Sequence, residues 1–110
     1  MQIESIFLGH VGDSPRMRVL QHFIEGRDFD YTLTDLLAAG VSWGTLHSLI
    51  PQLLAVGMIV ETRKVGRAIL YRINRNHVAV QSLLQLYDRL LLEQLDRVEE
   101  LAKNKMAIRA

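Results

Sequence analysis

The feature that most constrains this chain of 110 residues is the run Ala-Gly-Val-Ser at positions 39–42, which lies between two short amphipathic segments. Gly40 can adopt the left-handed conformation that ends a helix. Ser42 can cap a following helix through its side-chain hydroxyl. The run therefore predicts a helix over residues 35–39, a tight turn, and a second helix over residues 43–56.

Two strand-like runs follow this pair of helices, over residues 58–64 and 68–74. Gly66 lies between the runs and suits a hairpin turn. In the second run every other residue is apolar or aromatic, so one face of the hairpin can lie on a core; these residues are Ile69, Tyr71 and Ile73.

Two helices joined by a glycine-containing turn and followed by a basic hairpin resemble the winged-helix DNA-binding domain of small prokaryotic regulators, the group that includes the MarR, ArsR and PadR families. Three motifs carry the resemblance, which covers roughly residues 14–74: G-V-S-x-x-T-L from Gly40, I-x-x-L-L-x-x-G-M-I ending at Ile59, and G-R-x-x-x-Y from Gly66. It implies a duplex-DNA-binding transcriptional regulator and a short strand at Thr32-Leu33 that pairs with the hairpin.

The expected fold class is mainly α with a small β-hairpin wing (α+β). We expect a winged helix-turn-helix domain at residues 1–75 and a long dimerisation helix at residues 76–110. Ser14 followed by Pro15 predicts the start of a helix that stops at Gly26. Residues 3–8 are apolar and fit either a strand or a helix, and residues 9–13 are expected to form a loop.

From Asn76, a possible helix cap, the chain has no glycine or proline. A helix of about 30 residues would be roughly 45 Å long. Its apolar positions exceed what a small winged helix can cover, and they follow a near-heptad seam. We expect this seam to pair with a second copy of the chain, parallel or antiparallel; the alternative is that it folds back on its own domain. The seam residues are Val80, Leu84, Tyr87, Leu91, Val98 and Leu101.

The hairpin is basic although the net charge of the chain is only +1. Arg63, Lys64 and Arg67 flank the expected turn, where they could neutralise DNA phosphates. An ordinary solvated hairpin is the simpler alternative. Arg16 and Arg18 in the first long helix are further candidates for phosphate contacts.

The outer face of the helix over residues 43–56 is the candidate for base contacts. Its exposed positions and its cap are Ser42, Trp43, Gly44, Thr45, His47 and Ser48. The helix has no arginine or lysine, so the frequent bidentate contact between arginine and guanine is unavailable from it. Weak sequence specificity is therefore expected. The alternative is a winged-helix module that binds another protein through the Trp43 face and does not bind DNA.

Pro51 lies inside this same helix. Proline removes one backbone hydrogen bond and clashes with the preceding turn, at a cost of about 3 kcal/mol. We therefore expect the helix either to bend before Pro51 or to split there.

The sequence offers little for catalysis or cofactors. There is no cysteine, so disulfides and thiolate metal sites are excluded, and the four histidines are dispersed. A histidine–carboxylate site shared by two copies, such as one at His22, stays an open alternative. No nucleotide-binding loop, signal-peptide pattern or apolar run of about 20 residues is present. We expect a cytoplasmic protein that is not an enzyme, has no cofactor and does not bind membranes; the operator and any small-molecule effector are not specified.

Overall fold

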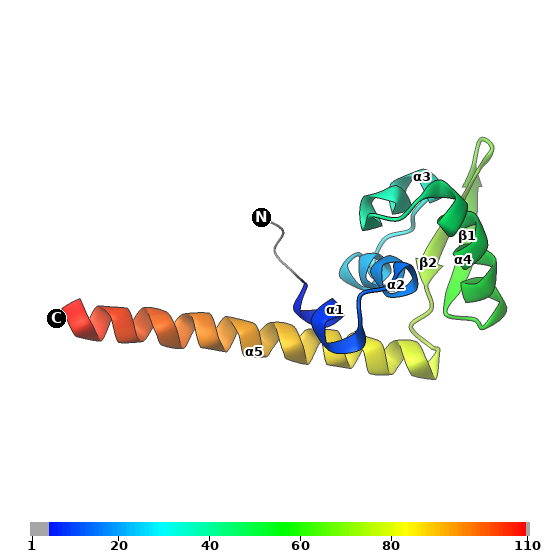
Figure 1. The fold of residues 1–110 in the computed structure, drawn as a ribbon. Helices are drawn as coiled ribbons and strands as arrows, with labels where there is room; N and C mark the ends of the chain where they lie inside the picture. The colour runs from blue at the N-terminus through cyan, green and yellow to red at the C-terminus, as the bar shows by residue number, and fades with distance from the viewer. Residues whose placement is uncertain (1–4, 110) are drawn as a thin grey trace.

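The computed structural model describes residues 5–109, with side chains as far as Lys105. A long helix crosses one side of a small domain and continues beyond it, while a hairpin projects from the domain (Figure 1). The elements in chain order are α1 (Ile6–Val11), α2 (Pro15–Glu25), α3 (Leu33–Leu36) with a 3₁₀ turn η1 (Leu37–Ala39), α4 (Trp43–Ala55), β1 (Ile59–Val65), β2 (Ala68–Ile73) and α5 (Val78–Arg109).

The turn between the two central helices forms as predicted. Gly40 is left-handed with a φ of 81°, and the Ser42 hydroxyl accepts a hydrogen bond from the Thr45 N–H over 3.1 Å. The first of the two helices begins earlier than predicted. The Thr32 hydroxyl accepts a hydrogen bond from the Asp35 N–H, and the Asp35 carboxylate accepts one from the Thr32 N–H, which together form a capping box.

The short strand predicted at Thr32-Leu33 is displaced by one residue. Tyr31 makes the bridge, exchanging two backbone hydrogen bonds of 2.8 Å with Tyr71 of β2. Thr32 does not extend this bridge, because its N–H donates to the Asp35 carboxylate and its carbonyl accepts from the Leu36 N–H.

Strands β1 and β2 form an antiparallel hairpin, which we call the wing. Val65 pairs with Ala68, so the turn contains two residues and Gly66 has a φ of 62°. The register shifts between Glu61 and Arg63, where Thr62 is left as a bulge. The alternation predicted for β2 holds only in part: Tyr71 and Ile73 are buried, but so is Leu70 beside the bulge.

The N-terminal part of the fold is helical. Ser14 caps α2 and Gly26 ends it, both as predicted. The alternatives for residues 3–8 are resolved as a helix from Ile6 onward; residues 3 and 4 lie outside the described part. The loop predicted for residues 9–13 is wrong over its first three positions, which complete α1.

The start of α5 is set by His77 and not by Asn76. The His77 Nδ1 accepts from the Ala79 N–H at 3.1 Å and caps the helix. Its Nε2 donates to the Val56 carbonyl at 2.9 Å. One imidazole therefore links the end of α4 to the start of α5.

The first turns of α5 belong to the core of the domain. Val80 is fully buried, Leu84 packs against the core, and the Tyr87 ring meets Phe7 edge-on at 5.6 Å. This corrects the predicted dimer seam. Val80 is buried in the core of its own domain, and Leu84 and Tyr87 pack against that core, so these three residues do not lie on a free surface. The alternative in which the helix folds back on its domain therefore holds for this part of the seam. No described helix is long and apolar enough to cross a membrane.

Gly26 leaves room for the Tyr31 ring. A Cβ at this position would lie 1.5 Å from the Tyr31 hydroxyl and 2.6 Å from the adjoining ring carbon. The same ring makes edge contacts with His22 and Phe23 at centroid distances of 5.0 and 5.9 Å. The tyrosine that bridges the wing is thus held between α2 and its own loop.

We predict that Gly26→Ala destabilises the protein by about 1–3 kcal/mol, because the methyl group must displace a packed ring. Gly9→Ala is the control: nothing lies within 4 Å of its Cβ position in α1, and alanine favours a helix by up to about 1 kcal/mol. Urea unfolding measures both variants. Equal midpoints for Gly26→Ala and the wild type would contradict the packing.

Candidate nucleic-acid interface

The two faces of α4 divide as the sequence predicts. Leu46, Ile50 and Leu53 are buried against the core. On the opposite side the side chains are exposed or, at Thr45, half-buried, and none is charged; these positions are Trp43, Gly44, Thr45, His47, Ser48, Pro51, Gln52 and Ala55. The helix is continuous from Trp43 to Ala55 with Pro51 inside it, so of the two alternatives, a bend or a split, the split does not occur.

The start of α4 lies next to the start of α2. A shallow cleft of about 300 Å³ between them is lined by both capping serines, Ser14 and Ser42. The Ser42 hydroxyl is used within the cap, since it also donates to the Thr45 Oγ1 at 2.8 Å. An anion at this helix start would therefore be bound by backbone N–H groups of the first turn and not by the Ser42 hydroxyl.

Arg18 lines the same cleft but is already engaged. It donates to both carboxylate oxygens of Asp13 at 2.6 and 2.9 Å and to the Gly40 carbonyl at 3.4 Å. The hydrogen bond from Arg18 lowers the pKa of Asp13. Arg18 thus fixes the turn before α4, and its charge is compensated locally.

Trp43 occupies the space between α4 and the wing. Its side chain is 47% exposed and meets the His47 ring edge-on at 4.8 Å. It also lines a cleft of about 270 Å³ with Leu33 of α3 and with Arg67 and Tyr71 of the wing region. Trp43 is therefore neither buried in the core nor fully exposed to solvent.

The three predicted wing cations differ in their surroundings. Lys64 and Arg67 are exposed and make no ion pair among the residues that the structure describes. Arg63 instead donates to both carboxylate oxygens of Asp30, from Nε at 2.9 Å and from Nη2 at 3.3 Å. The Thr62 hydroxyl donates to the same carboxylate at 2.6 Å. These bonds lower the pKa of Asp30 to about 2.

Asp30 is a residue that sequence reasoning missed. It lies in the loop between α2 and α3, 33 positions before Arg63. The local signal was the concentration of charges at Arg27, Asp28 and Asp30. No cluster of three or more metal-ligating side chains occurs in the described part of the chain.

The overall arrangement is a neutral helix face flanked by an anion-attracting helix start and by a cationic hairpin tip. Trp43 of the exposed face of α4 and Arg67 of the wing turn line the same cleft, so the wing adjoins this face at the start of α4.

Several solved structures have a similar fold. NadR, solved in complex with 4-hydroxyphenylacetate, superposes with a TM-score of 0.62 at 17% identity over 93% of this chain and 72% of its own. The antimony-specific transcriptional repressor AntR superposes with a TM-score of 0.57 at 22% identity, over 84% of this chain and 78% of its own. Rv0081 of M. tuberculosis superposes with a TM-score of 0.54 at 24% identity, over 84% of this chain and 89% of its own.

No protein-family profile and no curated protein matches the chain. The structural likenesses confirm the predicted fold: the chain is a winged helix, and a long C-terminal helix follows its hairpin.

Proposed function

We propose that this protein binds duplex DNA as a homodimer in the cytoplasm and regulates transcription. The observation that carries the proposal is the exposed face of α4 beside an unpaired cationic wing tip on a winged-helix fold. Proteins of similar structure include the transcriptional repressor AntR and MepR, a transcription regulator of the Staphylococcus aureus multidrug efflux pump MepA.

In this proposal α4 enters the major groove and the wing contacts the backbone. Gly44 allows close approach of the helix, and Thr45, His47 and Ser48 offer hydrogen-bonding groups to base edges or phosphates. The first-turn N–H groups at the Ser42 cap face a phosphate. Since α4 has no cation, affinity comes mainly from Lys64 and Arg67, and sequence discrimination is weak.

The homodimer rests on the part of α5 beyond the domain. Positions three or four apart share one face of a helix, so the face that packs on the core continues as an exposed apolar stripe. The stripe consists of Leu91, Leu95, Val98 and Leu101, which are 47%, 56%, 55% and 63% exposed. A second copy of this stripe is the occupant that matches it, as in self-complementary dimers.

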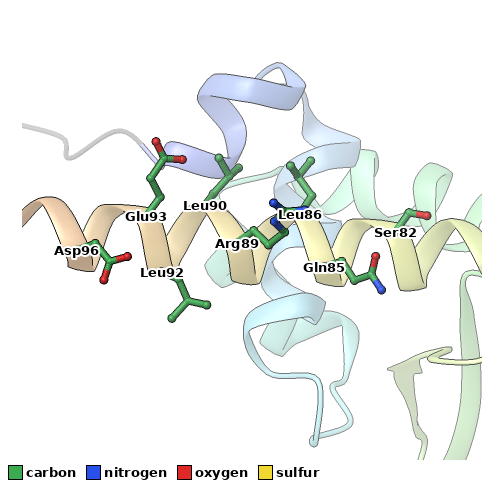
Figure 2. A pocket seen from close by; sticks show the side chains of 8 residues that line it. All are labelled: Ser82, Gln85, Leu86, Arg89, Leu90, Leu92, Glu93 and Asp96. Atoms are coloured by element: carbon green, nitrogen blue, oxygen red, sulfur yellow. The ribbon is translucent and has the colours of Figure 1, made fainter.

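The opposite face of α5 mixes polar side chains with leucines. Figure 2 shows its side chains, of which Ser82, Gln85, Arg89, Glu93 and Asp96 are polar and Leu86, Leu90 and Leu92 are apolar. We propose the stripe and not this mixed face as the dimer contact, because the stripe repeats apolar side chains along one side of the helix. A groove of about 480 Å³ between α1, α2 and α5 includes Leu91, so it adjoins the place where the stripe begins.

A protein-binding module is the second candidate function. The neutral face of α4 and the exposure of Trp43 favour it, because exposed aromatic residues often anchor protein interfaces. In that case Trp43→Ala is the damaging substitution.

The α4 face is tested with Ser48→Glu, which places a negative charge where DNA would lie. We expect at least about tenfold weaker binding to duplex DNA from repulsion by phosphates. Ser82→Glu, the same change on the outward face of α5, serves as the control and should bind as the wild type does. Unchanged DNA affinity in Ser48→Glu, with circular dichroism showing a folded protein, would remove α4 from the interface; loss of partner binding in Trp43→Ala would then favour the second candidate.

The wing is tested with Lys64→Ala combined with Arg67→Ala. Binding to every duplex should weaken alike, and the slope of log affinity against log salt should flatten by about two units, one for each lost phosphate contact. Arg89→Ala removes an exposed cation from α5 and should leave the slope unchanged. A wild-type slope in the double variant would show that the wing tip does not contact phosphates.

The dimer is tested with Leu95→Asp combined with Val98→Asp. These changes leave the core turns of α5 intact, and we expect a monomer with weaker binding to a two-half-site duplex, because the half-sites are no longer bound together. Leu92→Asp on the outward face should remain dimeric. Sedimentation reads the mass, and a monomeric wild type at tens of micromolar would rule the dimer out.

A further inference from the structure

The loop between α2 and α3, residues 26–32, contacts both the wing and the start of α5. On the α5 side, Arg27 donates to both oxygens of Asp88 at 3.0 and 2.7 Å, and Asp28 pairs with Arg75. A hydrogen bond of 3.0 Å from the Phe29 N–H to the Gly26 carbonyl closes the loop itself. The loop is therefore anchored before it reaches the wing.

On the wing side the loop holds both strands. The Asp30 carboxylate accepts from Thr62 and Arg63 of β1, and the next residue, Tyr31, exchanges two backbone bonds with Tyr71 of β2. The Asp30 side chain is only 13% exposed, whereas Arg63 is 62% exposed. The carboxylate is thus covered by the groups that it binds.

The position of these bonds on β1 matters. Thr62 is the bulged residue, and a bulge is the place where a strand bends and changes its twist. A carboxylate that binds the bulge and the residue after it fixes the direction in which the rest of the hairpin leaves the domain.

We propose that Asp30 is the positioning residue of the wing, and that Arg63 serves as its anchor and not as a phosphate contact. The proposal rests on the proposed function, since it is the DNA-bound wing that Asp30 positions. It reverses the expected sign of a charge effect. An aspartate near DNA normally repels phosphates, so its removal should tighten binding; here its removal releases the wing and weakens binding.

The first experiment compares Asp30→Asn with Glu61→Gln in the full-length protein on duplex DNA. Both variants lose one negative charge on or beside β1, and Glu61 makes no ion pair within the described residues. We expect Asp30→Asn to bind about five- to tenfold more weakly than the wild type, while Glu61→Gln binds as well or better. If both variants tighten binding alike, Asp30 is only a repulsive charge and the proposal is wrong.

A double-mutant cycle with Arg63→Gln separates the anchor from a phosphate contact. For an anchor, Asp30→Asn, Arg63→Gln and the double variant should lose similar affinity, because each breaks the same pair. For a phosphate contact, Arg63→Gln would cost about one unit of salt slope in either background. Additive losses would overturn the proposal.

A third measurement does not depend on DNA. In Asp30→Asn, backbone amides of β1 and β2 should exchange with solvent faster, while those of α2 and α4 keep their wild-type protection. Unchanged exchange in the wing would overturn the proposal by itself. If the wild type does not bind duplex DNA, the proposed function fails, and this exchange measurement still decides whether Asp30 holds the wing.

Discussion

The structure depends on the burial of the first turns of α5 in the core of the winged helix. Val80 is fully buried, and Tyr87 packs on Phe7 and donates to Glu25 at 3.2 Å. Without this packing the small domain would expose one side of its core. With it, the long helix leaves the domain in a fixed direction, so the stripe beyond Leu90 and the exposed face of α4 are held in one rigid relation.

Features with a local chemical cause could be predicted from the sequence. The left-handed Gly40 and the caps at Ser14 and Ser42 depend on residues within one turn, so their identity was sufficient. The start of α5 was misplaced because His77 is an unusual cap that also needs the distant Val56 carbonyl. Spacing alone likewise does not say whether an apolar seam is covered by its own domain or by another molecule.

In the candidate interface, too, features with a local cause could be predicted, and features that depend on distant residues could not. Helical periodicity was enough to separate the exposed and buried sides of α4, since Leu46 and Leu53 recur at helical spacing. The role of Arg63 could not be read in this way. Its partner Asp30 is far away in sequence, and only the folded chain brings the loop beside the bulge at Thr62. Charge counts therefore overstate how many cations of the wing are free.

The position of Trp43 has a practical consequence for spectroscopy. It is the only tryptophan in the chain, and its half-exposed indole lies at the first turn of α4. Tryptophan emission will therefore report on this one corner of the molecule. The far-ultraviolet circular dichroism signal comes from all the helices, of which α5, with 32 residues, is the longest. Coincident transitions by the two probes would show that the corner and the long helix unfold as a single cooperative unit.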